Sequence, residues 1–290
     1  MGSLSKPLYG IVLVMCAGLL LASHDGFSKY LTLTYPLIMV IWLRYFVQTV
    51  AMICLFFPTM RWTMLRTQRP WLQLLRGVCL LSISLLFIQG LTYIPLAEAT
   101  AVMFLAPLIV TILSAAVLHE KVSRGQWVAV CAGFLGVLFI VRPGGALFTP
   151  AILLPLCASC CFAVYQLITR RLASTDHAVT SNFLSGMFGT VMLLFVLPDQ
   201  YTLDVATLDL MFMLALGLLG MTAHMLLTIA LKYSSAATLA PFTYAQIIFA
   251  GVVGYFAFGQ LPDLYALIGV VIISCSGLAV AYLQHQAPAD

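Results

Sequence analysis

Long apolar stretches separated by short polar links run through the whole chain. Dividing the sequence at its charges and at its Pro and Gly clusters gives ten such stretches, near residues 8–30, 36–57, 74–93, 97–118, 126–141, 150–169, 179–198, 209–231, 237–258 and 265–283. A helix needs roughly 20 mainly apolar residues to cross a bilayer. The pattern therefore predicts an all-α membrane protein with ten transmembrane helices and a short cytoplasmic tail at 284–290.

The composition agrees with this interpretation. Hydrophobic residues make up 63% of the chain and charged residues 8%, with a mean hydropathy of +1.09. Soluble domains are about 25% charged, so this chain has too little charge to cover a water-exposed surface. The apolar stretch that follows Lys6 has the length of a signal peptide, but without a convincing cleavage site we interpret it as a retained first helix.

Positive charges lie mainly at one side of the predicted bundle. If the N-terminus is cytoplasmic, the outer side holds only Lys29 and Arg142. The inner loops and span ends then hold Lys6, Arg61, Arg66, Arg69, Arg76, Lys121, Arg124, Arg170, Arg171 and Lys232. The positive-inside rule thus places both termini in the cytoplasm. We expect the membrane to be a bacterial inner membrane. This distribution explains the net charge of +4, so we expect no nucleic-acid partner.

The second half of the chain repeats the first. The run Leu91-Thr-Tyr-Ile-Pro-Leu-Ala97 matches Leu231-Lys-Tyr-Ser-Ser-Ala-Ala237, and at the same offset Phe104 matches Tyr244 and Glu120 matches Gln260. We therefore expect two five-helix repeats, at 8–142 and 150–283. Because five is odd, the second repeat must have the opposite orientation in the membrane.

The charges of equivalent loops support this inversion. The loop after the second stretch contains Arg61, Arg66 and Arg69. Its counterpart after the seventh stretch contains Asp199, Asp204 and Asp209 and no Lys or Arg.

These motifs resemble a known family. Leu91, Tyr93 and Ala97, then Pro107, the run Leu118-His-Glu-Lys-Val-Ser123, and Gly125, Gly133 and Gly136 resemble the EamA module of the drug/metabolite transporter superfamily; the second half repeats the pattern, with Gln260 where the family often has Glu. The resemblance implies a ten-helix carrier with an inverted repeat around a central cavity. Family members move amino acids, nucleotide-type metabolites, sugars and organic acids.

Ionisable residues at membrane depth are the first candidates for function, because each needs a partner or a cavity. Asp25 and Lys29 are four residues apart on one helix face and could form an ion pair at the outer headgroups. Together with His24, which can titrate near neutrality, they could instead form an outer gate or a proton-sensitive site.

Arg44 lies within the second stretch and cannot lose its proton there. Its partner could be Asp25 or Glu98, or it could hold the carboxylate or phosphate of a substrate. The resemblance draws attention to the substrate-binding interpretation of Arg44, since an Arg after a Pro in the second span recurs in that family. Glu98 opens the fourth stretch, where it could stabilise the helix dipole or act in proton coupling.

The later stretches contain further candidates. His224 could join two helices or face the cavity, and it is a third candidate for proton coupling with Asp25 and Glu98. Pro107 and Pro241 are predicted to kink their helices and free backbone carbonyls. The remaining candidates for substrate contact are Phe104, Tyr244 and Gln246, which could also be core residues, and Gln89 and Tyr165, which could also bridge helices.

We therefore predict a secondary carrier for an organic anion or an amino-acid-like metabolite that works by alternating access, with proton coupling as one option. An exporter of hydrophobic cationic drugs is the alternative, while an intramembrane enzyme or a passive channel fits less well because the required motifs are missing. No cofactor or metal is expected: Cys157 and Cys160 lack a second ligand pair. The expected partners are a small-molecule substrate and the lipid bilayer, with the protein a monomer or a weak homodimer.

Overall fold

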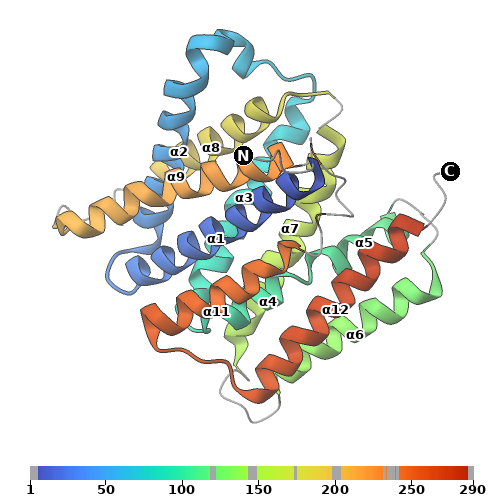
Figure 1. The fold of residues 1–290 in the computed structure, drawn as a ribbon. Coiled ribbons are helices and arrows are strands. Elements are labelled where there is room, and N and C mark those ends of the chain that lie inside the picture. The colour runs from blue at the N-terminus through green and yellow to red at the C-terminus, as the bar shows by residue number, and fades with distance from the viewer. Residues whose placement is uncertain are drawn as a thin grey trace.

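A computed structural model describes residues 6–117, 122–142, 149–172, 175–197, 204–230, 233, 239 and 242–286. Every regular element in these ranges is a helix (Figure 1). The helices are α1 (Lys6–Thr32), α2 (Leu37–Met60), η1 (Arg61–Leu65), α3 (Pro70–Leu91), α4 (Leu96–Met103), α5 (Ala106–Val117), α6 (Arg124–Val141), η2 (Pro150–Ile152), α7 (Leu153–Leu172), α8 (Ala178–Leu194), α9 (Thr207–Ala230), α11 (Ala245–Phe258) and α12 (Leu264–Gln286).

Most of these helices are long and apolar enough to cross a membrane. Within the described residues, seven helical segments satisfy both criteria, and three further apolar helices, at Ala178–Leu194, Ala245–Phe258 and Leu264–Val280, are shorter. Large apolar side chains point outward, among them Phe256 and Ile248 on α11, which are 81% and 68% exposed. An apolar exterior of this kind suits contact with lipid.

The fourth apolar stretch differs from its prediction as one continuous helix. α4 ends at Met103 and α5 begins at Ala106, with a tight turn in which Leu105 N–H donates to the carbonyl of Val102 at 3.0 Å. Pro107 explains the interruption, because it has no N–H to bond to the carbonyl of Met103. The proline therefore occupies the first turn of α5. Its counterpart Pro241 lies outside the described residues, as do Glu120 and Lys121.

Helices from the two halves of the sequence pack against each other throughout. α1 lies between α9 and α11, α3 packs on α7 and α8, and α2 packs on α8 and α9. α6 and α12 run side by side at one edge of the array, away from α2 (Figure 1). The halves thus form one interleaved bundle.

Close contact between α6 and α12 depends on two glycines. A β-carbon added at Gly269 would lie 2.5 Å from the carbonyl oxygen of Gly136, and one added at Gly136 would lie 2.9 Å from the carbonyl oxygen of Gly269. Both obstacles are backbone atoms, which cannot turn aside. Small residues allow this approach between membrane helices.

We predict that Gly269→Ala destabilises the protein by about 1–3 kcal/mol, because the added methyl group must separate α6 from α12. Thermal unfolding in detergent measures the effect. Gly251→Ala on α11 is the control, since its new β-carbon would only touch that of Ala97 at 3.8 Å. Equal melting temperatures for the two variants would contradict the packing argument.

Candidate functional site

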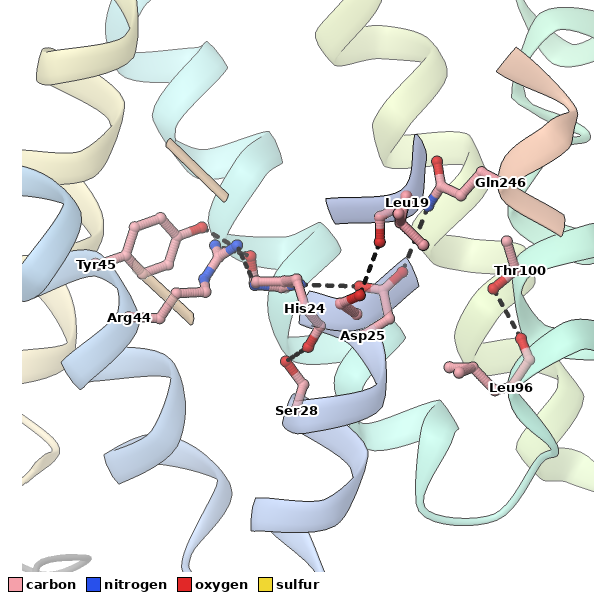
Figure 2. Close-up of polar contacts among 11 residues, drawn as sticks. Leu19, His24, Asp25, Ser28, Arg44, Tyr45, Leu96, Thr100 and Gln246 are labelled. Atoms are coloured by element: carbon pink, nitrogen blue, oxygen red, sulfur yellow. Dashed lines mark hydrogen bonds and ion pairs between the residues drawn. The ribbon is translucent and has the colours of Figure 1, made fainter. Parts of the chain in front are cut away.

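A buried cluster of polar side chains lies where α1, α2, α3 and α11 meet. We call it the central cluster; its members are His24, Asp25, Arg44, Tyr45, Ser84 and Gln246. His24, Asp25 and Arg44 are 4%, 7% and 8% exposed. In Figure 2 the contacts extend from Arg44 through His24 to Asp25 and on to Gln246.

Arg44 has only neutral neighbours in direct contact. Its Nη2 donates to Ser84 Oγ at 2.7 Å, its Nη1 lies 3.5 Å from His24 Nε2, and the guanidinium sits 4.3 Å from the ring centre of Tyr45. The buried Nε has no hydrogen-bond partner. Among the described residues, the ion pairs join His24 to Asp25 and Arg142 to Asp263, and neither includes Arg44. The partners we considered for Arg44, Asp25 and Glu98, are therefore not in contact with it.

The position of the guanidinium is fixed by α3. Tyr45 OH donates to the carbonyl of Leu80 at 3.0 Å and lies 2.8 Å from Ser84 Oγ, which itself lies 2.9 Å from the same carbonyl. Consecutive residues of α2 thus both reach one turn of α3. This arrangement orients Arg44 toward α1.

His24 separates the two charged groups of the cluster. Its Nδ1 lies 3.0 Å from Asp25 Oδ1. A guanidinium can only donate, so the contact with Arg44 makes Nε2 the acceptor and assigns the ring proton to Nδ1, which donates to Asp25. The second carboxylate oxygen of Asp25 accepts from Gln246 Nε2 at 3.5 Å. The site therefore has a cationic side at Arg44 and an anionic side at Asp25.

Lys29 does not pair with Asp25, although the spacing predicted it. α1 continues to Thr32, and both side chains are buried inside the bundle, where Asp25 is 7% and Lys29 is 4% exposed. Lys29 Nζ instead donates to the carbonyl of Ile94 at 2.7 Å, just after α3. Glu98, in the first turn of α4 as expected, is 4% exposed, and its Oε2 has no hydrogen-bond partner.

Two aromatic residues that match at the sequence offset of 140 are in contact with each other. Phe104 ends α4 and Tyr244 precedes α11, and their ring centres are 4.9 Å apart. The buried hydroxyl of Tyr244 has no hydrogen-bond partner. It lies over Gly277 of α12, where a β-carbon would come far too close. The repeat offset thus relates two residues that touch.

A second arginine, Arg76, is also buried. In the sequence analysis it counted only as one of the positive charges at the inner side and was not a candidate for the site. Arg76 is 2% exposed, and all of its donors are used. Nε donates to Thr169 at 2.9 Å; Nη1 donates to the Ser181 carbonyl at 2.5 Å and to Ser185 at 2.7 Å; Nη2 donates to Tyr165 at 2.5 Å and to Asn182 at 3.0 Å. Tyr165 therefore contacts Arg76 and not the central cluster.

The other candidates occupy different surroundings. His224 on α9 lies within electrostatic range of Arg44, Arg76 and His24. Gln89 turns to Thr92 and Tyr93 at the end of its own helix, at 3.4 and 3.3 Å, and so does not join the cluster. Among the described residues, no three His, Cys, Asp or Glu side chains are arranged to hold a metal ion.

Comparison with known proteins identifies the family. The model of the EamA-like transporter family matches residues 8–142 and again residues 149–282. The chain belongs to the EamA-like transporter family. Proteins of this family are transporters of the drug/metabolite transporter superfamily, so the chain is a multi-pass membrane protein of that kind.

Named relatives of this EamA-like protein carry small metabolites. An S-adenosylmethionine uptake transporter of Rickettsia felis is 29% identical over 266 residues, covering 92% of this chain and 90% of the relative. A riboflavin transporter of Vibrio cholerae is 29% identical over 283 residues, covering 96% and 94%. A crystal structure with 18% identity superposes with a TM-score of 0.65 over 98% of this chain and 100% of the other, which shows a shared fold.

Contacts between loops join the halves of the EamA-like protein at both ends. At one end Tyr35 OH donates to Asp209 Oδ2 at 2.8 Å and accepts from the N–H of Ala206 at 3.2 Å. At the other end Asp176 accepts from Thr67 Oγ1, from the N–H of Gln68 at 3.1 Å and from Gln73 Nε2 at 2.7 Å.

The hydrogen bonds at Asp176 change its acidity. Burial alone would raise the pKa of this carboxyl, but the donors from Thr67, Gln73 and Gln68 outweigh burial and lower the pKa below its ordinary value. A carboxyl whose pKa is lowered by folding stabilises the fold above its unfolded pKa of about 3.9. That contribution is lost as the pH falls through the lower, folded-state pKa.

We predict that Asp176→Asn lowers the melting temperature at pH 7. Its difference from the natural protein should narrow as the pH falls below about 4, because the carboxyl of the unfolded chain then becomes protonated while the folded one, with its lower pKa, still resists protonation. Thermal unfolding in detergent between pH 7 and pH 3.5 measures this. Thr67→Val removes one donor but keeps the carboxyl, so it should cost less stability. A difference that stays constant across the pH range would contradict the role of the ionised carboxylate.

Proposed function

We propose that the protein is a secondary carrier in a bacterial inner membrane that moves a small zwitterionic metabolite by alternating access. In this proposal ten helices form two inverted repeats, at 8–142 and 150–283, and the central cluster binds the substrate between them. The observation on which the proposal depends is the buried guanidinium of Arg44, which has a free Nε and no carboxylate in contact.

The pattern of helix contacts supports the two repeats. In the two repeats, the counterparts of α1, α2 and α3 are α7, α8 and α9. If every helix is replaced by its counterpart, the contact of α1 with α9 becomes that of α7 with α3. In the same way, the contact of α2 with α9 becomes that of α8 with α3. All four contacts occur, and α2–α8 and α6–α12 join helices to their own counterparts. A twofold relation between the halves accounts for this pairing.

Loop contacts support the inverted orientation. Inversion puts the link at 33–36 and the loop before α9 on the outer side, and these segments meet through Tyr35 and Ala206. It puts the loop at 66–69 and the link before α8 on the inner side, and these meet through Thr67 and Asp176. With the positive-inside rule, both termini are cytoplasmic.

Arg44 supports a substrate with a carboxylate or another anionic group. Transferring a charged side chain to the membrane interior is costly, and Arg cannot avoid the cost by deprotonation. A guanidinium presents its donors in a planar fork that matches a carboxylate. A substrate carboxylate would fill the unused donor at Nε and replace the 3.5 Å contact with His24.

Asp25 supports a positive group on the same substrate. It lies on the far side of His24 from Arg44 and has only a neutral imidazole and an amide as partners (Figure 2). S-adenosylmethionine, which the Rickettsia relatives are named for, has a carboxylate, an ammonium group and a sulfonium group. Riboflavin is uncharged at neutral pH. The two charged sides of this site therefore suit the first chemistry better than the second.

A cationic drug fits the site less well. Asp25 would attract a cation, but Arg44 lies beyond His24 in the same cluster and would repel it. Asp25, Glu98 and His224 are the groups that could couple transport to protons, since each can change its charge inside the bundle.

We predict that Arg44→Gln weakens binding of a carboxylate substrate by about 10- to 100-fold, because a hydrogen bond to a charged group is worth about 1.5–3 kcal/mol. Counterflow of labelled S-adenosylmethionine into proteoliposomes, with thermal stabilisation of the purified protein as the binding assay, measures the loss. The melting temperature without substrate should change little, because Arg44 is incompletely bonded.

Arg76→Gln provides the comparison for that experiment. It removes a fully bonded cation that joins α3 to α7 and α8, so it should lower the melting temperature without substrate. The proposal is wrong if Arg44→Gln transports carboxylate substrates normally, or if the natural protein exchanges no member of a panel of S-adenosylmethionine, amino acids, organic acids and nucleosides.

We predict that the natural protein is stabilised more by S-adenosylmethionine than by its decarboxylated analogue or by riboflavin. Asp25→Asn should reduce the preference for S-adenosylmethionine over riboflavin, because Asp25 contacts the positive side of the substrate. Arg44→Gln should remove the preference over the decarboxylated analogue, because Arg44 contacts the carboxylate. A thermal-stabilisation series with the three compounds measures both effects. Stronger stabilisation by riboflavin in the natural protein would contradict the zwitterion assignment.

A further inference from the structure

A half-open cleft lies at the end of α2, away from the central cluster. It has a volume of about 260 Å³, and its walls include Ile53 and Phe57 on α2, Arg61 and Trp62 on η1, and Phe183 and Met187 on α8. Its lining is almost entirely apolar, and among the described residues that border it Arg61 is the one with a charge. A cleft of this composition suits a hydrocarbon chain with an anionic group at its mouth.

The cleft forms where the chain changes direction between the end of α2 and η1. α2 contains Pro58 and ends at Met60, and Arg61 follows in the left-handed region with φ 47°. Met64, 1% exposed, then anchors η1 in an apolar cluster with Met52 and Phe183. Trp62 is 68% exposed and meets Phe57 edge to face, with ring centres 5.6 Å apart.

Charge at this end is positive and not neutralised. Arg61, Arg66 and Arg69 are exposed, and none forms an ion pair within the described part of the chain. Asp176 is the nearby acid, and its carboxylate is occupied by Thr67, Gln68 and Gln73. Trp at the interface and clustered Arg beside a span are features of segments that contact anionic headgroups.

We propose that a phospholipid with an anionic headgroup binds here, with one acyl chain in the cleft and its phosphate against Arg61 and Arg66. The apolar walls account for the chain, and the unpaired arginines account for the preference in headgroup. This site is separate from the central cluster and does not depend on which substrate the protein carries.

The test measures lipid retained by the purified full-length protein. Native mass spectrometry compares phosphatidylglycerol with phosphatidylcholine of identical acyl chains. We expect phosphatidylglycerol to bind more tightly and Arg61→Gln to weaken its binding about fivefold, because one basic residue near an anionic lipid surface contributes about that much. Arg61→Lys keeps the charge and should retain most of the preference.

Two controls separate this site from general attraction to the membrane. Arg124→Gln removes an exposed arginine at the start of α6, at the other edge of the array (Figure 1), and should leave binding unchanged. Met187→Trp fills the cleft without altering charge and should weaken binding of both lipids. Glycerol 1-phosphate, which has no acyl chain, should not compete.

Several results would overturn the proposal. Equal retention of the two lipids would mean that the cleft binds an acyl chain without any preference for the headgroup. An equal loss in Arg61→Gln and Arg124→Gln would indicate diffuse electrostatics, and competition by glycerol 1-phosphate would indicate a headgroup site without the cleft. Each variant is first checked for the natural protein's elution profile and melting temperature. If Arg61→Gln does not fold, Met187→Trp decides the result, because unchanged lipid binding with the cleft filled would contradict the site.

Discussion

The permanent charge of Arg44 constrains everything around it. A guanidinium inside a bilayer protein cannot become neutral at any physiological pH, so neighbouring helices must supply polar atoms or a ligand must supply charge. Here α3 supplies Ser84 and α1 supplies His24, yet these two contacts use only part of the guanidinium, and its buried Nε has no partner. Arg76 shows the alternative, in which five neutral acceptors satisfy every donor and the residue becomes a structural connection. The incomplete shell of Arg44 is what makes it suited to binding.

α1 has a special position because it connects the two sides of the central cluster. His24 and Asp25 are consecutive, so the helix directs them about 100° apart. One therefore faces α2, and the other reaches Gln246 on α11. Any displacement of α1 relative to α2 or α11 changes both contacts at once. The neutral imidazole between the charges is also the group whose protonation would alter the balance between them.

Sequence reasoning located the apolar stretches because they follow from the hydrophobic pattern, and the repeat matched Phe104 to Tyr244 without predicting that their rings meet. It was wrong about Asp25 and Lys29, because the rule for residues four apart ignores neighbouring helices. Here the carbonyl of Ile94, left free after α3 ends, competes successfully for the ammonium group. It missed Arg76 as a buried residue because its partners, Thr169, Ser181, Asn182 and Ser185, become neighbours only through packing.

The sets of loop contacts at the two ends have a kinetic consequence. Tyr35 with Asp209 at one end and Asp176 with Thr67 and Gln73 at the other hold both mouths of the bundle together in the same structure. In the proposed alternating-access cycle, leaving this state toward either side would break one set and preserve the other. The relative strength of the two sets would then bias which mouth opens more often, and so the asymmetry between the inward and outward half-saturation concentrations. Net transport would still follow the gradient, while a few hydrogen bonds far from the central cluster would influence the pace of each half-cycle.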